Sequence, residues 1–156
     1  MAWLKSAQRR IAKFARLGLR EQWLAIRIVG MLWRVRIALW VLPFQRVRAM
    51  ATRMGRAGVG KNASGISAHN LTSLISVAAV HVPGASCLTQ ALVAQALLER
   101  YGYEPVLKIG VGRTGPDNRF GAHAWIELEG KVVIGQVTML DQYTQLPTLA
   151  AVTPEK

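Results

Sequence analysis

The chain has 156 residues, 51% of them hydrophobic, and a formal net charge of +12. This length and this apolar content suffice for one domain with a core of its own. The only cysteine, Cys87, excludes an internal disulfide and a closed zinc site made of thiolates. A lone thiol is typical of a reducing compartment, so we expect a cytoplasmic protein without a structural metal.

The charge is distributed unevenly along the chain. Residues 1–61 contain fourteen Lys or Arg residues and one acidic residue, whereas residues 62–156 contain six basic and seven acidic residues. The first part therefore carries a net charge of +13 and the second a net charge of −1. We predict a basic amphipathic helical region over 1–61 and a core over 62–156, packed together as one compact unit.

Three helices are expected in the basic part. Residues 2–18 and 21–41 have helical periodicity, and Pro43 ends the second segment because proline disfavours a helical residue before it. A shorter basic segment, 44–56, is also expected to be helical. The apolar stretch 23–44 contains Arg27 and two further arginines, each costing about 2.5–3.5 kcal/mol at the centre of a bilayer. We therefore predict neither a transmembrane span nor an export signal.

The segment "GRAGVGKN", residues 55–62, resembles part of a phosphate-binding loop. That motif requires Ser or Thr after the lysine and a strand before the loop. Here Asn62 follows the lysine and a basic helical segment precedes the loop. We therefore expect a glycine-rich hinge over 54–65 and no nucleotide cofactor.

The second part of the chain begins with two helices and continues with strands. Ser67 is the expected N-cap of a helix that runs to about Val80, and "HVPGAS" separates it from a helix over 87–101 that is apolar on nearly every side. The segments 105–113, 120–129 and 131–137 have the pattern of strands, with a tight turn at 129–130. The expected fold is α+β, with basic helices first and then a central helix packed on a small antiparallel sheet.

Cys87 lies in the first turn of the expected central helix. Pro83 and Gly84 end the preceding element and Ser86 can cap the helix. The free N–H groups and the positive end of the helix dipole favour a thiolate at this point, and the same amides can stabilise an oxyanion. The alternative is a small apolar side chain that only fills the core.

His123 is the expected base for this thiol. A cysteine nucleophile needs an imidazole within hydrogen-bond reach to take and return its proton. His123 lies on a strand whose alternation places Trp125 and Glu127 on the same face. His69 and His81 lie on or beside a helix, where we expect solvent-facing or capping roles.

The residue that orients the histidine has two candidates, Gln136 and Asp141. The turn at 129–130 predicts three cross-strand pairs, namely Leu128 with Lys131, Trp125 with Ile134, and His123 with Gln136. Gln136 can accept the ring N–H but brings no negative charge. Asp141 is the nearest downstream carboxylate, and a bulge or kink at Gly135 would bring it closer.

The basic helices are the part of the chain most suited to a charged partner. Cations interleaved with tryptophans favour an anionic membrane surface, an acidic protein or a nucleic acid. Motifs for base recognition are lacking in the sequence, so we expect no specific nucleic acid. Residues 1–61 are expected to be available for peripheral contact with an anionic membrane surface.

Residues 82–135 resemble the transglutaminase-like cysteine peptidase of lasso-peptide biosynthesis, the leader peptidase that forms the catalytic half of the B protein. The resemblance rests on Cys-Leu-x-x-Ala from Cys87, on the Gly-Val at 110–111 and on His-Ala-Trp from His123. It implies a papain- or transglutaminase-type core with a Cys-His-Asp triad, in which Cys87 is the nucleophile and His123 the base. The family's Asp is expected at Gly135 or Gln136, where this chain has no acid.

The resemblance also implies partners and a substrate. The substrate is a ribosomally made precursor peptide whose leader is removed before an ATP-dependent lasso cyclase closes the ring. A separate leader-recognition protein is expected, because this chain contains no obvious segment of that kind. Two other functions stay open from the residues themselves, namely acyl transfer by the same thiol and a basic helical adaptor in which Cys87 only packs.

Overall fold

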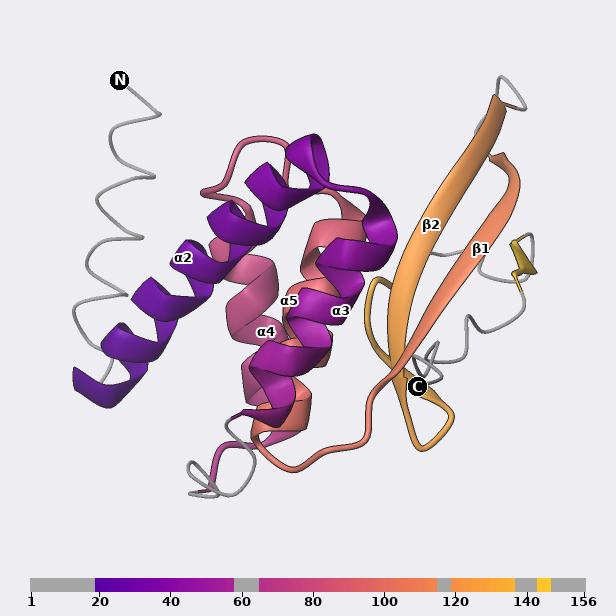
Figure 1. Ribbon diagram of the computed structural model, residues 1–156. Coiled ribbons are helices and arrows are strands. Elements are labelled where there is room, and N and C mark those ends of the chain that lie inside the picture. Colours follow the sequence, from indigo (N-terminus) through magenta and orange to yellow (C-terminus); the bar gives the residue numbers. More distant parts are fainter. Residues whose placement is uncertain (1–18, 58–64, 115–118, 137–142, 147–156) are drawn as a thin grey trace, which may run out of the picture.

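The computed structural model describes residues 19–57, 65–114, 119–136 and 143–146 (Figure 1). Its helices are α2 (Leu19–Val41), α3 (Phe44–Arg56), α4 (Ala68–Ala79) and α5 (Cys87–Arg100). Its strands are β1 (Val106–Thr114), β2 (Arg119–Leu128), β3 (Lys131–Ile134) and β4 (Thr144–Gln145). The helices pack on one side of a small antiparallel sheet, as Figure 1 shows, so the predicted α+β fold is confirmed.

The basic part of the chain forms the helices α2 and α3. α2 ends at Val41, and Pro43, with φ of −59°, precedes the first turn of α3. The helix predicted over 44–56 is confirmed, whereas the helix predicted over 2–18 lies outside the described residues. Of the helices that the structure describes, none combines the length and apolarity that a membrane span requires.

The hinge predicted over 54–65 is wrong at its first residues, which form the last turn of α3. Gly55 is buried there because α3 packs closely on α5. A Cβ at this position would lie 2.5 Å from a carboxylate oxygen of Glu99 and 3.0 Å from the carbonyl oxygen of Ala96. Gly55 therefore serves helix packing, which its place in a phosphate-loop motif did not indicate. Residues 58–64 lie outside the described residues.

Both α4 and α5 begin at a serine cap, as predicted. The hydroxyl of Ser67 accepts a hydrogen bond from the amide of Asn70 at 3.2 Å, and that of Ser86 accepts one from the amide of Thr89 at 3.3 Å. Such a cap stabilises a helix by about 1 kcal/mol. The middle of α5 is enclosed on all sides, with Leu92 and the two residues after it fully buried. The prediction of a buried central helix is confirmed.

A single hydrophobic core joins every described helix to the sheet. Its members include Ile28, Leu32, Val47, Ala51, Leu71, Ile75, Leu92, Leu98, Leu107 and Ile126. Burying a large aliphatic side chain contributes about 1.5–3 kcal/mol, so this shared core holds the helices before and after residue 61 together. The boundary at residue 61 separates two charge regimes, and apolar packing continues across it.

The sheet has the strand order β3-β2-β1-β4, with antiparallel pairing throughout. β1 and β2 form the long central pair, which runs from Val106 opposite Glu127 to Thr114 opposite Arg119. β4 was not predicted. It consists of two residues that pair with Gly110 and Val111 of β1, and so short a strand leaves no alternating pattern in the sequence.

The hairpin that joins β2 to β3 has the predicted two-residue turn. Glu129 and Gly130 both have positive φ, 50° and 77°, as the tight hairpin turn of the type I′ kind requires. The predicted pair of Leu128 with Lys131 is confirmed. The predicted pair of Trp125 with Ile134 is wrong by one residue, because a bulge beyond Val132 places Ile134 opposite Ile126. The predicted pair of His123 with Gln136 is not part of the ladder, because β3 ends at Ile134 and not at residue 137.

Candidate active site

Cys87 is the first residue of α5 and is half-buried. The loop before it is held from α2, since the Nε of Arg36 donates a hydrogen bond to the carbonyl of Pro83 at 3.2 Å. The guanidinium also lies so close to Gly84, which has φ of 72°, that a Cβ there would collide with it. This clamp and the Ser86 cap fix the position at which α5 begins and therefore the position of the thiol.

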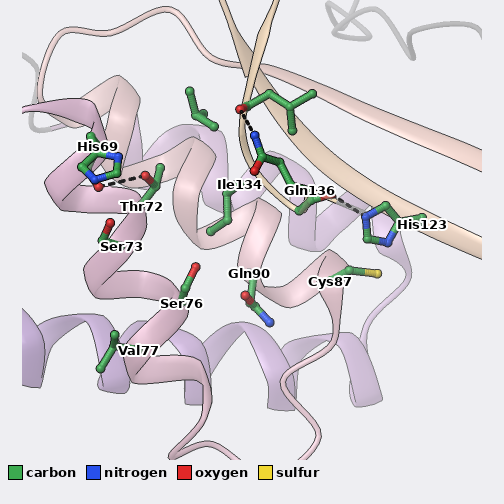
Figure 2. A pocket seen from close by; sticks show the side chains of 13 residues that line it. His69, Thr72, Ser73, Ser76, Val77, Cys87, Gln90, His123, Ile134 and Gln136 are labelled. Atoms are coloured by element: carbon green, nitrogen blue, oxygen red, sulfur yellow. Dashed lines mark hydrogen bonds between the residues drawn. The ribbon is translucent and has the colours of Figure 1, made fainter. Parts of the chain in front are cut away.

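His123, on β2, is oriented by a backbone carbonyl. Its Nε2 lies 2.7 Å from the carbonyl oxygen of Gly135. A carbonyl can only accept, so this hydrogen bond places the proton of the neutral ring on Nε2 and leaves Nδ1 as an acceptor. Figure 2 shows the second ring nitrogen directed toward the sulfur of Cys87. The ring is thus arranged to receive a proton on the side of the thiol.

The imidazole is also held by aromatic neighbours. Its ring centroid lies 6.1 Å from that of Trp125, with the planes at 17°, and 5.5 Å from that of Tyr143. Trp125 is only 2% exposed, and its indole N–H donates to a carboxylate oxygen of Glu127 at 2.9 Å. The prediction that His123, Trp125 and Glu127 share one face of β2 is confirmed. A fixed tryptophan beside the imidazole limits the rotation of its ring.

Gly135 cannot be replaced without disturbing this arrangement. Its φ is 81°, and a Cβ would lie 2.7 Å from the carbonyl oxygen of Ala124 and 2.9 Å from the Cβ of Trp125. The chain passes β2 so closely at this point that only glycine fits. The family pattern expects an aspartate at 135 or 136, and in this chain the carbonyl of Gly135 is what contacts His123.

The two predicted orienting residues have different outcomes. Gln136 is exposed, and its side-chain amide donates to the carbonyl of Val132 at 3.2 Å. In Figure 2 that amide points away from His123. Asp141 lies outside the described residues. The contact of His123 with the carbonyl of Gly135 was not predicted, and the only signal for it in the sequence was a glycine directly after a strand.

One cavity, of about 820 Å³, brings the candidate residues together. It is bordered by α4, by the first turns of α5 and by β3, and its lining includes Cys87, Gln90, His123 and the segment 132–136 (Figure 2). A smaller cavity of about 140 Å³ also contacts both Cys87 and His123, between the apolar side chains of Phe44 and Leu88. Both Cys87 and His123 therefore border each of the two cavities.

The other two histidines are both exposed, as predicted. His69 lines the cavity from α4, and His81 is not part of its lining. The wall that α4 contributes to the cavity was not predicted, and it consists of His69, Thr72, Ser73, Ser76 and Val77. Within the described ranges, no three His, Cys, Asp or Glu side chains lie together in a way that would hold a metal ion.

The site can perform thiol chemistry on a carbonyl. Cys87 begins a helix, so its amide N–H lies among the groups that lack a partner within the helix. A half-buried thiol, an imidazole with a fixed tautomer and free amides at a helix start are the elements of covalent catalysis by cysteine.

Comparison with known proteins supports this interpretation. The sequence profile of the transglutaminase-like superfamily matches residues 30–148, a range that includes about half of α2 and all the later elements of the fold. No significant match was found among curated proteins or among solved structures. The match covers both Cys87 and His123 and more than half of the chain, and the chain therefore belongs to the transglutaminase-like superfamily.

Proposed function

We propose that the protein is a cysteine endopeptidase that removes the leader from a ribosomally made lasso-peptide precursor. The superfamily includes cysteine peptidases, and the residues 82–135 carry the resemblance to the lasso-peptide leader peptidase. The observation that carries the proposal is the pairing of Cys87 with His123 in one cavity, with the Nε2 of His123 bonded to Gly135.

The proposed reaction has two steps. The sulfur of Cys87 attacks the carbonyl carbon of the scissile peptide bond, and the Nδ1 of His123 takes the thiol proton. The same nitrogen then protonates the leaving amine as the C–N bond breaks, which leaves a thioester on Cys87. A water molecule, deprotonated by His123, hydrolyses the thioester and restores the thiol. Throughout, the carbonyl of Gly135 accepts the Nε2–H and stabilises the imidazolium.

The oxyanion of each tetrahedral intermediate needs hydrogen-bond donors. The amide of Cys87 is one, because the first N–H groups of a helix have no acceptor within it. Gln90 lines the same cavity one turn further along α5. Its amide donates to the carbonyl of Ala85 over 3.4 Å, a long bond that leaves the side chain available.

The precursor and its partners follow from the sequence resemblance. We propose that a separate leader-recognition protein presents the precursor, and that an ATP-dependent cyclase acts on the product. The assay therefore combines the chain with precursor and recognition protein and follows the product masses. Hydrolysis adds one water across the cut bond, whereas acyl transfer would add the mass of an amine.

The Cys87→Ala variant tests the nucleophile. We expect it to lose cleavage by about 10³-fold or more, since removal of the nucleophile leaves only binding and oxyanion stabilisation. Its thermal unfolding should match that of the wild type, because the side chain is small and only half-buried. Cleavage by Cys87→Ala at the wild-type rate would contradict the proposal.

The exposed face of α2 favours a second function, peripheral binding to an anionic membrane. Three tryptophans and two isoleucines form one stripe along the helix, namely Trp23, Ile26, Trp33, Ile37 and Trp40, and they are between 43% and 80% exposed. Arg27 and Arg34 are exposed beside them. Tryptophan with arginine suits the boundary between lipid headgroups and acyl chains.

Vesicle cosedimentation tests this second function. We expect binding to vesicles of phosphatidylcholine with phosphatidylserine, loss of binding in high salt, and none to phosphatidylcholine alone. The double variant Trp23→Ser/Trp33→Ser should weaken binding, whereas Val80→Ser, at an exposed apolar residue directly after α4, should not. No binding at low salt would exclude the membrane as a partner of this face.

A further inference from the structure

The outer edge of β3 borders the cavity that contains Cys87 and His123. β3 is the terminal strand in the order β3-β2-β1-β4, so one side of its backbone has no partner strand among the described residues. The cavity lining includes the whole segment 132–136. A free strand edge can pair with an extended peptide, and this edge leads to the candidate nucleophile.

The hairpin register identifies a carbonyl that points outward from this edge. A two-residue turn is closed by a hydrogen-bonded pair, which here is Leu128 with Lys131. The next pair, Glu127 with Val132, is then of the non-hydrogen-bonded kind. The carbonyl of Val132 therefore points away from β2 and toward the free edge.

The side chain of Gln136 already donates a hydrogen bond to that carbonyl. Its amide nitrogen donates to the carbonyl oxygen of Val132 at 3.2 Å, although the side chain is exposed. A primary amide is the side-chain group most similar to the N–H of a peptide bond. Gln136 thus makes the hydrogen bond that an added strand would make.

The opposite wall of the cavity is formed by α4 and contains hydroxyl groups. Ser73 and Ser76 of α4 are exposed and line the cavity, with His69 one turn before Ser73. Among the lining residues that the structure describes, none is Lys, Arg, Asp or Glu. The volume of about 820 Å³ is in the range of sites that enclose a whole ligand.

We propose that an uncharged, extended peptide segment binds between α4 and β3 as an additional strand, with one of its backbone N–H groups replacing the amide of Gln136 at the carbonyl of Val132. Gln136 then protects the strand edge in the free protein and releases it to the substrate. The proposal rests on the peptidase function, since it assigns the substrate-binding groove of that site. It gives Gln136 a part in binding the peptide, which is distinct from orienting the imidazole.

Peptide chloromethyl ketones test the strand pairing. The thiolate of Cys87 displaces chloride and forms a thioether, and the dependence of the rate on concentration yields the inhibition constant KI. We compare acetyl-tetraalanine chloromethyl ketone with analogues that are N-methylated at one amide at a time. The analogue that is methylated at the amide facing Val132 should have a KI at least about 10-fold higher. It loses the N–H that would bond to this carbonyl and places a methyl group against the strand edge. Equal KI values across the series would contradict the proposal.

The Gln136→Ala variant tests the role of the side chain. Without the side-chain amide of Gln136, the carbonyl of Val132 is free to accept from the inhibitor, and the KI of the same inhibitor should fall by about 2- to 10-fold. The maximal alkylation rate and its pH profile should stay unchanged. The matched control is Gln145→Ala, an exposed glutamine on β4. A large fall in the maximal rate with unchanged KI would mean that Gln136 orients His123, and the proposal would be wrong.

The charge of the peptide provides a second comparison. The chain carries a net charge of +12, so long-range attraction alone would favour a glutamate-containing peptide. An uncharged groove should instead disfavour both signs, because a charge loses hydration without gaining a partner. We expect Glu and Lys at the position next to the reactive group to raise KI by about 10-fold each. Tighter binding of the Glu peptide would contradict the neutral groove.

Binding to a chain without its nucleophile separates this proposal from the peptidase function. The Cys87→Ala protein is labelled with ¹⁵N and titrated with acetyl-tetraalanine amide. Shifts at the amides of Val132 and Gln136, including the side-chain amide, support strand addition even if the wild type cleaves no peptide. Cleavage by the wild type with no shift in this segment would overturn strand addition and leave the peptidase function in place.

Discussion

The two ends of α5 place polar groups in opposite surroundings. At its start, Cys87 and Gln90 line an open cavity, and the Ser86 hydroxyl caps the helix. At its other end, Glu99 lies against Gly55 of α3, and the amide of Gln95 donates to the carboxylate of Glu99 at 3.0 Å. One oxygen of each of these two side chains is buried without a hydrogen-bond partner.

Because of this difference, we expect the start of α5 to affect reaction rates and its other end to affect the stability of the fold. Polar atoms at the open end are available to a reacting molecule, and their loss should change rates more than folding. Unsatisfied polar atoms at the closed end lower the stability of the fold, since each costs about 1–3 kcal/mol relative to solvent. Substitutions at the two ends should therefore move two different measurements.

The largest expected effect on cleavage is at His123, which lines the cavity together with Cys87 at the start of α5. The His123→Gln variant should cleave the precursor about 10²- to 10⁴-fold more slowly, because no group takes the thiol proton. Iodoacetamide should also alkylate Cys87 more slowly at neutral pH. His81→Gln, at an exposed histidine outside the cavity, is the control and should behave as the wild type. Equal cleavage by both variants would remove His123 from the mechanism.

A smaller effect is expected at Gly135, whose carbonyl orients the imidazole. Gly135→Ala introduces a Cβ where only 2.7 Å is available and where φ is 81°. We expect a loss of about 1–3 kcal/mol in the free energy of unfolding and a fall of about 10- to 100-fold in cleavage. Denaturant unfolding and cleavage of the remaining folded protein measure the two effects.

Gly130 provides the matched control for this substitution. Its φ is also positive, 77°, but a Cβ there would meet nothing within 4 Å. Gly130→Ala should therefore lose stability without losing cleavage per folded molecule. If both alanine variants cleave at the wild-type rate, the carbonyl of Gly135 has no part in orienting His123.

Removal of the serine cap of α5 should lower both the free energy of unfolding and the rate of cleavage by a modest amount. Ser86→Ala should lower the free energy of unfolding by about 1 kcal/mol and should also slow cleavage, because the first turn carries Cys87. Ser67→Ala removes the same kind of cap from α4 and should lower stability by a similar amount. We expect it to leave cleavage nearly unchanged. Identical kinetics in the two variants would show that the start of α5 needs no cap for activity.

The smallest effect on activity is expected at the closed end. Burial raises the pKa of Glu99 above its usual 4.5, and the hydrogen bond from Gln95 and the charge of Arg56 oppose this rise. Below pH 4.5 the carboxyl is protonated in both the folded and the unfolded chain. As the pH rises through the raised pKa of the folded state, the half-buried carboxyl group must ionise and stability is lost.

The Glu99→Gln variant tests this linkage. Its melting temperature should exceed that of the wild type at neutral pH, and the difference should vanish as the pH falls to 4.5. Cleavage should not change. Glu104→Gln, at an exposed glutamate, should show no such pH-dependent gain. A lower melting temperature of Glu99→Gln at pH 7 would show that the charge of Glu99 is stabilising.

The sequence by itself determined the local features of this protein. Serine caps, the break at Pro43, the turn at 129–130 and the position of Cys87 at a helix start all depend on residues a few positions apart. Their physical chemistry is the same in any fold, so they could be predicted closely. The placement of His123 and Trp125 on one face of β2 is equally local, and it was predicted correctly for the same reason.

Tertiary structure alone decided what surrounds these residues. The bulge beyond Val132 shifts the register by one residue, and a pattern of alternating side chains does not reveal an extra residue that packing absorbs. The carbonyl that meets His123 has no side chain and therefore no sequence signature of its own. The wall of α4 and the close contact of Gly55 with α5 arise because distant segments share one core. Cys87 and His123 could be selected as candidates from the chain alone, and their setting could not be predicted, because it depends on non-local packing.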